Sequence, residues 1–431
     1  MHISDTLGGL PRPNARRLTA ITVPSGIGGV TALNKSLREA LDGTGPAIIP
    51  VPESPDYVVQ AILSACKPDN INFPLETDDI AVAVATSGST GTPRGVLLTT
   101  HALTASAQAF GMRFGVHARW VVALPVHRIA GLMVLVRCFV HDSPFEIDPS
   151  VGGARTFEAP TFYATTMRAR RLCDSDGRSL MISLVPTQIA RLIEAGPVGL
   201  DALRAYDVVL SGAAATPQPM LEKLRNAGVN VVVSYGMSET CGGCAFDGQP
   251  LDGVTISLAT QDEAEPGRIS ISGPVVADGY RLRPDIDALT FVDGRMLTHD
   301  VGKLDSAGLL HVLGRLDDVV TVGGVNVSLS AVEALIRHHN AIDEVAIVDV
   351  ADAAWGSLPI AYLVSHDSAA SESQLVAEIR NVVAERIGQA ATPREFFFVN
   401  ALPMLDSGKV DRLTLRLRAA QDLLDAHNAR P

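Results

Sequence analysis

Ten consecutive residues, 86–95, read Thr-Ser-Gly-Ser-Thr-Gly-Thr-Pro-Arg-Gly and combine hydroxyl side chains, glycines and one cation. Glycines let backbone N–H groups approach an anion closely, while the hydroxyls and Arg94 add hydrogen-bond donors and positive charge. A Gly/Ser-rich turn or linker has a similar composition, but it does not require Pro-Arg-Gly after its glycines or an apolar strand on each side. The segment is therefore predicted to hold a polyphosphate. The Walker pattern is absent, because no Gly-Lys-Ser/Thr follows at the required spacing.

Residue types suited to a nucleotide recur between residues 211 and 300. Residues 234–240, Ser-Tyr-Gly-Met-Ser-Glu-Thr, contain an aromatic ring and Glu239, whose carboxylate is the kind of ligand that a hard cation bridging phosphates needs. Residues 211–216, Ser-Gly-Ala-Ala-Ala-Thr, offer small side chains against which a flat base can lie, and residues 298–300, Thr-His-Asp, add a carboxylate. Taken singly, each segment has a structural alternative: a solvated surface carboxylate, tight helix packing or a turn residue.

The C-terminal part of the chain contributes glycines and charges at three places. Residues 314–318, Gly-Arg-Leu-Asp-Asp, are polar between two apolar strands, and residues 323–324 are Gly-Gly, which permits close approach to the backbone. Lys409 follows Leu402-Pro403-x4-Gly408 and precedes Val410-Asp411-Arg412, so that glycine and proline restrict how the loop presents it. A lone lysine in a loop is nearly always solvated. A functional role for Lys409 is therefore predicted only because of the residues around it.

Composition limits the class of protein. The 431 residues are 47% hydrophobic, enough for a large core and for two or three domains. The formal net charge is 35 − 47 = −12, which argues against nucleic acid or an anionic membrane surface as a partner. No apolar run approaches the ~18 residues of a membrane-spanning helix, and the first residues lack a signal-peptide pattern. The sequence predicts a cytoplasmic protein without stable membrane insertion, and a homo-oligomer is compatible with it.

The five cysteines are scattered, as expected in a reducing compartment. Cys241-Gly-Gly-Cys244 has Cys-x-x-Cys spacing, but a structural zinc site would need two further ligands, which no second Cys or His pair supplies. A redox protein that uses Cys241 and Cys244 is one alternative, tested by whether their double replacement by Ser leaves activity intact. Small residues that line a pocket wall are the preferred interpretation.

Periodicity predicts the elements that would position these residues. From about residue 80 to residue 233, apolar runs that read as strands alternate with helical patterns, which indicates a mainly parallel sheet covered by helices. Ligands of such sheets bind at the carboxyl ends of strands, and three loops are expected there: 125–127, 211–216 and 234–240. Helices are also expected to begin at the caps Thr100 and Ser330, with Glu333 completing a capping box.

Changes in composition and in the predicted secondary-structure pattern along the chain indicate two domains. Residues 1–30 show no period and are expected to be extended or poorly ordered. After residue 254, short strands with Gly and Pro turns predict a β-rich subdomain at about 254–315. The charged segment 314–318 then separates an N-terminal domain, residues 1–315, from a small α+β domain, residues 316–431. The predicted fold class is α/β, with mainly parallel sheets covered by helices in the large N-terminal domain.

Six of these segments, in this order from Thr86 to Arg412, resemble motifs of the adenylate-forming superfamily. This superfamily includes acyl- and aryl-CoA ligases, firefly luciferase and the adenylation domains of peptide synthetases. The resemblance extends over nearly the whole chain and implies an enzyme that uses ATP, Mg²⁺ and coenzyme A. The chain departs from the usual pattern in having Arg94 for Lys, His299 for Gly, and only about 85 residues before the phosphate loop.

The resemblance implies a role for each segment that faces the nucleotide. Tyr235 would contact adenine, Asp300 would accept hydrogen bonds from the ribose hydroxyls, Arg315 would touch ribose or phosphate, and Glu239 with Thr90 would bind Mg²⁺. Arg94 would supply the phosphate cation. The full set of nucleotide-binding residues implied is Thr86, Ser87, Gly88, Ser89, Thr90, Gly91, Gly212, Ala213, Ala214, Tyr235, Gly236, Ser238, Asp300 and Arg315.

The resemblance also implies a reaction in two steps. A carboxylate attacks the α-phosphate of ATP, which gives an acyl-AMP and releases pyrophosphate, while Lys409 bridges the carboxylate and the nucleotide. The C-terminal domain then rotates about Asp317, and the thiol of coenzyme A, whose pantetheine arm would pass Gly323 and Gly324, attacks the acyl group and releases AMP. Lys409, Glu239 and Arg94 are therefore the predicted catalytic residues.

Three segments, 127–132, 183–188 and 236–243, resemble the o-succinylbenzoate–CoA ligases of menaquinone biosynthesis, and the short front end resembles compact actinobacterial members. Two alternatives stay open: an enzyme that adenylates another aryl or acyl acid or loads a carrier protein, and a non-catalytic nucleotide- or metabolite-binding protein on the same fold. Retention of Lys409, Glu239 and Asp300 argues against the second. The predicted substrate-binding residues are His127, Ser183, Thr187, Gln188, Ser211 and Gly236, with Arg137 as a further contributor.

Overall fold

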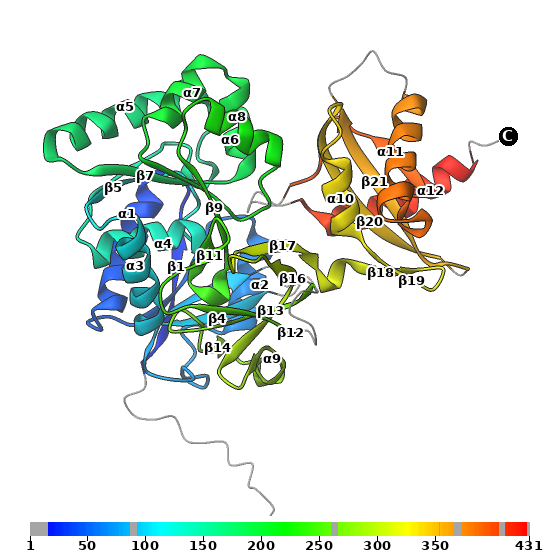
Figure 1. Ribbon diagram of the computed structural model, residues 1–431. Helices are drawn as coiled ribbons and strands as arrows, with labels where there is room; N and C mark the ends of the chain where they lie inside the picture. Colours follow the sequence, from blue (N-terminus) through cyan, green and yellow to red (C-terminus); the bar gives the residue numbers. More distant parts are fainter. Residues whose placement is uncertain are drawn as a thin grey trace, which may run out of the picture. The chain divides into compact units, whose positions relative to one another are not determined.

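The computed structural model describes residues 16–86, 93–259, 266–352, 354–365, 372–404 and 410–428, without the side chains of residues 317 and 424–428. Contacts divide the chain into two compact units, one formed by Met1–Ala213, Leu224–Ile256 and Ile271–Leu297, the other by Ala214–Lys223, Ser257–Ser270 and Thr298–Pro431. The predicted α/β class is confirmed, since sheets and covering helices alternate along the chain (Figure 1). Among the described helices, none is both long and apolar enough to cross a bilayer.

The first sheet corrects the expectation for the N-terminal residues. Its order is β1-β2-β3-β4-β14, with β1–β2 and β2–β3 parallel and the remaining pairs antiparallel. Residues 18–23 are extended, as strand β1, but a helix begins at residue 27, which the sequence did not predict. The bounds are β1 Leu18–Val23, α1 Ile27–Leu41, β2 Ala47–Pro52, α2 Asp56–Cys66, β3 Ile80–Thr86, β4 Arg94–Thr99 and β14 Gly279–Tyr280.

The second sheet has the order β11-β10-β9-β8-β7-β5-β6, and its members from β9 to β6 are parallel, as predicted. Every residue of β5 is buried, as expected for a parallel strand covered on both faces. In this sheet β6 lies on one side of β5 and β7 lies on its other side. The direction in which successive strands are added therefore reverses between β5 and β7. The strand bounds are β5 Ala118–Val122, β6 Phe145–Ile147, β7 Ser179–Leu184, β8 Val208–Ser211, β9 Val231–Met237, β10 Gly242–Phe246 and β11 Gln249–Pro250.

Helices connect the parallel strands, and two of them, α5 and α7, were not predicted. The apolar residues of α5 are interrupted by many Thr and Arg residues, which obscures its helical period. The N-cap of α3 is Thr99 rather than Thr100, because the Thr99 hydroxyl accepts a hydrogen bond from the Ala102 amide. The bounds are α3 Thr100–Phe114, α4 Ile129–Val140, α5 Ala159–Asp176, α6 Pro186–Glu194, α7 Pro197–Arg204 and α8 Gln218–Asn226.

The β-rich stretch expected after residue 254 is present. It forms a sheet of order β12-β13-β16-β15, in which β17 also pairs with β16. Thr298, His299 and Asp300 all lie within β16. The bounds are β12 Thr255–Ala259, β13 Gly267–Ser272, α9 Pro284–Thr290, β15 Phe291–Val292, β16 Arg295–Leu304 and β17 Leu310–Arg315.

The C-terminal sheet, β19-β18-β21-β20 with β22 beside β21, is covered on both faces. Along β20, Val345 and Ile347 join the core under α10 and α11, whereas Ala346 and Val348 join the core under α12, as the period of two requires (Figure 1). The bounds are β18 Val319–Val322, β19 Val325–Ser328, α10 Leu329–Ile336, β20 Ile342–Asp352, β21 Gly356–Ser365, α11 Glu372–Arg386, β22 Glu395–Phe398 and α12 Arg412–Asn428.

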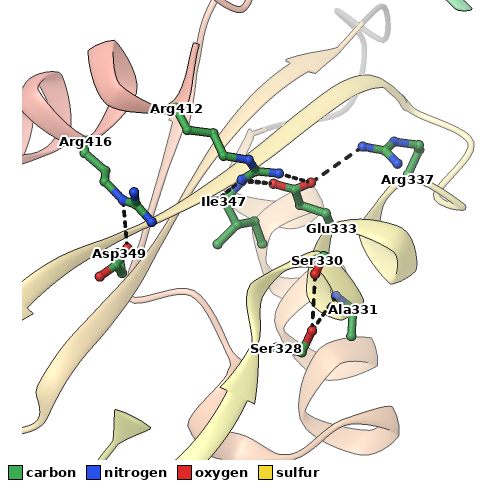
Figure 2. Close-up of polar contacts among 9 residues, drawn as sticks. All are labelled: Ser328, Ser330, Ala331, Glu333, Arg337, Ile347, Asp349, Arg412 and Arg416. Atoms are coloured by element: carbon green, nitrogen blue, oxygen red, sulfur yellow. Dashed lines mark hydrogen bonds and ion pairs between the residues drawn. The ribbon is translucent and has the colours of Figure 1, made fainter. Parts of the chain in front are cut away.

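Glu333 does not complete a capping box. The N-cap of α10 is Ser328, whose hydroxyl accepts from the Ala331 amide, and Glu333 lies farther along the helix (Figure 2). Its buried carboxylate accepts hydrogen bonds from the Arg412 guanidinium at 2.8 Å and from the Ile347 amide at 2.6 Å. Arg412 also donates to the Ile347 carbonyl. Glu333 therefore ties α10 to β20 and to the start of α12.

Glu333→Ala is expected to destabilise the C-terminal sheet by about 1–3 kcal/mol, because it leaves the buried Ile347 amide without its acceptor and the partly exposed Arg412 guanidinium without its carboxylate partner. Hydrogen exchange of the β20 amides would measure the change. Asp349→Ala is the matched control, since the Asp349–Arg416 pair joins β20 to the same helix but is more exposed (Figure 2), and such a pair is worth about 0–1 kcal/mol. Equal losses in both variants would contradict the role given to Glu333.

Candidate active site

The predicted phosphate loop connects two paired strands. β3 ends at Thr86 and β4 begins at Arg94, and these two residues face each other across the antiparallel pair. The Thr86 hydroxyl donates a weak hydrogen bond of 3.4 Å to the Arg94 carbonyl, and the Arg94 Nε is buried without a hydrogen-bond partner in the described residues. Ser87, Gly88, Ser89, Thr90 and Gly91 lie outside the described residues, so their roles stay predictions.

Residues 234–240 are not the loop that was expected. β9 continues through Met237 and pairs with β10, and a 3₁₀ turn at Ser238–Thr240 follows. A Cβ at Gly236 would lie 2.0 Å from the Gly242 carbonyl oxygen, so the pairing of the two strands already requires this glycine. The Thr240 hydroxyl accepts from the Met237 amide at 3.0 Å and donates to the Gly242 carbonyl at 2.7 Å. The turn that carries Glu239 is thereby fixed.

Glu239 lies beside a tyrosine that sequence reasoning missed. The Tyr280 hydroxyl donates a 2.8 Å hydrogen bond to Glu239 Oε1, and the Arg94 guanidinium carbon is 5.9 Å from the centre of the Tyr280 ring. Burial and the neighbouring Glu239 raise the pKa of Tyr280, which therefore stays protonated and donates. Arg94 and Glu239, predicted separately as the phosphate cation and the metal ligand, thus lie near the same side chain, Arg94 by the ring and Glu239 at the hydroxyl.

The small-residue loop begins where β8 ends. Ser211 is buried, and the Gly212 amide donates a 3.2 Å hydrogen bond to the carbonyl of Leu184 at the end of β7. Ala213 has φ of +66°, a left-handed conformation that is uncommon for a residue other than glycine and is found more often at functional sites. Ser211, Gly212 and Ala213 therefore lie at the carboxyl edge of the parallel sheet, where a ligand was expected.

Four of the residues predicted to bind the acid substrate lie on both sides of the point where the strand order reverses. His127 follows β5, while Ser183 lies in β7 and Thr187 and Gln188 open α6. Gln188 accepts from the Val185 amide at 3.2 Å and donates to the Ala123 carbonyl at 3.3 Å, so it bridges the ends of β5 and β7. Burial, together with nearby Arg128, lowers the pKa of His127 to about 4. His127 is therefore neutral at pH 7.

Asp300 and Arg315 face each other across the β16–β17 pair, with Arg315 Nη1 3.5 Å from Asp300 Oδ1. The Thr298 hydroxyl accepts from the Asp300 amide at 3.0 Å and donates to the Ile269 carbonyl at 2.8 Å, which fixes this part of the strand. His299 occupies an exposed strand position and its φ is not positive, so the backbone here does not require glycine. A histidine in place of the family's usual glycine is accommodated.

Gly323 and Gly324 form the two-residue connection between β18 and β19, and Val322 pairs with Val325 across it. Both glycines have positive φ, +58° and +84°, as a type I′ hairpin turn demands. A Cβ at Gly323 would lie 2.8 Å from the ring of Trp355, a half-exposed aromatic side chain that the sequence did not single out. The turn thus explains both glycines, and their contact with coenzyme A stays a prediction.

Two predicted residues of the C-terminal motifs cannot be placed. Lys409 lies outside the described residues, but the chain on either side of its loop is joined by a bridge between Met404 and Val410. Asp317 belongs to a 3₁₀ turn at Leu316–Asp318, and its side chain is not among those described. The catalytic role of Lys409 and the hinge at Asp317 stay predictions, as does the domain boundary at residues 315 and 316.

Cys241 and Cys244 are both fully buried, and neither forms a disulfide. Burial raises the pKa of the Cys241 thiol. Because the thiolate is the reactive form of cysteine, a buried thiol with a raised pKa is a poor redox centre. The geometry favours packing over redox chemistry for Cys241.

Two family models match the sequence. The one described as AMP-binding enzyme matches residues 30–281, and the one described as AMP-binding enzyme C-terminal domain matches residues 331–409. The first includes Glu239, Tyr280 and both ends of the phosphate loop. The second includes Lys409.

Individual relatives point the same way. A probable 2-succinylbenzoate–CoA ligase of Mycobacterium tuberculosis is 37% identical over 408 residues, which are 94% of this chain and 99% of that protein. The o-succinylbenzoate CoA synthetase of Bacillus subtilis, solved with its acyl-adenylate intermediate, superposes with a TM-score of 0.70 at 24% identity, over 93% of this chain and 88% of that one. The same synthetase has been solved with ATP and magnesium ion. This chain belongs to the AMP-binding enzyme family of the adenylate-forming superfamily.

Proposed function

We propose that this adenylate-forming ligase converts 2-succinylbenzoate, ATP and coenzyme A into 2-succinylbenzoyl-CoA, AMP and diphosphate, as a step of menaquinone biosynthesis. The family supports the adenylate-forming chemistry, and the name of the Mycobacterium tuberculosis relative, a probable 2-succinylbenzoate–CoA ligase 37% identical to this chain, supports the choice of acid. The substrate is a dicarboxylate. Its succinyl carboxylate would be activated at the nucleotide, and its aryl carboxylate would lie deeper in the protein.

The observation that carries the proposal is a buried cation, Arg137 of α4. Its side chain is 4% exposed, stacks against the rings of Phe110 at 4.2 Å and Trp120 at 5.4 Å, and has no hydrogen bond or ion pair within the described residues. Burial lowers its pKa to about 10, so it remains charged at pH 7.

A buried charge without a counter-ion is costly, and aromatic contacts offset about 2 kcal/mol of that cost. The second carboxylate of a dicarboxylate substrate would supply the missing anion. Neutral His127, on the loop that precedes α4, could donate a further hydrogen bond. Simple fatty acids offer only one carboxylate, which the nucleotide step consumes, and they would leave Arg137 unpaired.

The residues of the site fit the first half of the reaction. The carboxylate oxygen of the acid attacks the α-phosphorus, and the bond to the departing diphosphate breaks. Charge develops on phosphate oxygens, which Arg94 and Lys409 would neutralise. Glu239 Oε2, which has no hydrogen bond in the described part of the chain, fits a divalent cation, and bound Mg²⁺ would supply further neutralising charge there.

The second half requires the thiol of coenzyme A. Its sulfur attacks the acyl carbon and AMP leaves. Gly323, Gly324 and the exposed ring of Trp355 would border the pantetheine arm. Between the two half-reactions, the C-terminal domain would rotate about Asp317. This rotation would move Lys409 away from the nucleotide and bring the surface around Gly323, Gly324 and Trp355 toward the acyl-AMP.

The test is release of diphosphate with a panel of aryl and aliphatic acids, with and without coenzyme A. The proposal expects 2-succinylbenzoate to be preferred and its thioester to form when coenzyme A is present. Acyl-AMP that passes to a carrier protein but not to coenzyme A would overturn the thiol acceptor. Absence of diphosphate release with every acid would favour a nucleotide-binding protein without catalysis.

Arg94→Ala is expected to raise the KM for ATP, because it removes the cation at the start of β4. Arg94→Lys should have a much milder effect, since a point charge suffices to stabilise a departing diphosphate. Initial-rate kinetics at varied ATP would measure both. An unchanged KM in the Ala variant would show that Arg94 points away from the phosphates.

A further inference from the structure

Tyr280 contacts side chains from three separate segments of the chain. Its hydroxyl donates to Glu239 Oε1 at 2.8 Å and also meets the hydroxyl of Thr290. Its ring lies beside the Arg94 guanidinium and packs 5.7 Å from the ring of Phe291. The side chain is 5% exposed, so this hydrogen bond is sheltered from water.

The backbone that carries Tyr280 is fixed on both sides. β14 pairs with β4, the Tyr280 amide donates to Asp287 Oδ1 at 2.7 Å, and the Arg281 amide donates to the Gly95 carbonyl at 2.7 Å. Glu239 is tied to the same segment, because its carbonyl accepts from the Ala277 amide at 2.8 Å. The distance between the phenol and the carboxylate is therefore set by strand pairing and not by flexible side chains alone.

The guanidinium of Arg281 adds a deeper anchor. It is fully buried and donates to the Cys66 and Pro74 carbonyls, at 3.1 and 2.6 Å, and to Glu76 Oε2 at 2.9 Å. Glu76 Oε1 in turn accepts from the Leu282 amide at 2.9 Å. These contacts hold residues 280–282 against the segment that precedes β3, and so against the strand that leads into the phosphate loop.

We propose that Tyr280 is a positioning residue for the divalent cation: its hydroxyl occupies Glu239 Oε1 and holds the carboxylate so that Oε2 is available to the metal. A carboxylate with both oxygens free can rotate about its terminal bond, whereas a hydrogen bond to one oxygen fixes the plane of the group. The inference rests on the proposed use of ATP and Mg²⁺ by this site. Tyr280 touches neither substrate nor metal in this account and acts through Glu239.

The test is Tyr280→Phe, which removes the hydroxyl and keeps the ring beside Arg94. Binding of Mn²⁺, a paramagnetic substitute for Mg²⁺, is followed by electron paramagnetic resonance in the presence of a non-hydrolysable ATP analogue. The dissociation constant for Mn²⁺ should rise about tenfold, the scale of one lost hydrogen bond to a charged group. The Mg²⁺ concentration that half-saturates acyl-AMP formation should rise in parallel.

Tyr206→Phe is the matched control. Tyr206 is a buried tyrosine of the same unit whose hydroxyl forms a 2.8 Å hydrogen bond with Thr166, away from Glu239. Its loss should lower Tm by an amount similar to that of Tyr280→Phe but leave Mn²⁺ binding unchanged. Equal effects of the two variants on Mn²⁺ binding would overturn the proposal, because the change would then reflect general destabilisation.

A double-mutant cycle with Glu239→Gln decides whether Tyr280 acts through Glu239. If it does, Tyr280→Phe should have no further effect on Mn²⁺ binding once Glu239 is replaced. The same tenfold effect in both backgrounds would overturn the proposal. The binding cycle needs no acid substrate, so a wrong assignment of the acid would appear in the diphosphate assay alone and leave this result interpretable.

Discussion

Lys409→Ala should slow formation of the acyl-AMP by about 10²–10³-fold, the scale for removal of one electrostatic stabiliser of the transition state. Thioester formation from preformed acyl-AMP should change much less, because the mobile domain would present Lys409 to the nucleotide in only one of its two orientations. Single-turnover measurements of diphosphate release and of thioester formation separate the two steps.

The described residues on either side of Lys409 are held by contacts within the C-terminal unit. Met404 and Val410 form a β-bridge, and Arg412 is paired with buried Glu333 (Figure 2). Lys303→Ala, which removes an exposed lysine of β16, is the control and should leave both steps unchanged. Equal loss of both steps in Lys409→Ala would show that the lysine does not distinguish them.

The second large effect concerns the choice of acid. The kcat/KM for 2-succinylbenzoate should exceed that for benzoate or a medium-chain fatty acid by on the order of 10³, because only the dicarboxylate pairs the buried donors of the site. Arg137→Met should remove most of this preference. It should lower kcat/KM for 2-succinylbenzoate by about 10²-fold, the loss expected for a charged hydrogen-bonding partner, and leave that for benzoate nearly unchanged.

Arg119→Met provides the matched control. Arg119 is also a buried arginine of the N-terminal unit, but it is paired with Asp176 at 2.9 Å and with Glu146 at 3.6 Å. Its replacement should lower stability without altering the ratio between the acids. If benzoate or the fatty acid serves wild type as well as 2-succinylbenzoate does, the substrate assignment is wrong and a general acid–CoA ligase remains.

Individual helices show which structural features can be predicted from the local sequence pattern and which cannot. In α11, Leu375, Ile379 and Val383 form a buried apolar stripe of helical period, which is a local property that the sequence alone reveals. α5 was missed because its buried residues other than Phe162 are small or polar and give no clear stripe. At α10 the pattern Ser-x-x-Glu is a valid cap signal, yet Glu333 is drawn to Arg412, 79 residues away, by burial that the pattern does not encode.

The sequence by itself determined the family of this protein, its α/β class, and the residue types of its phosphate loop and of the segment that carries Glu239. Those features depend on short spacings that chemistry restricts. Only the tertiary structure brought Tyr280 to Glu239 and Arg94, and buried Arg137 with no counter-ion among the residues it describes. The contact between residues 239 and 280 depends on which strands pair, and the burial of Arg137 depends on what packs around its helix. Neither can be predicted from the spacing of residues along the chain.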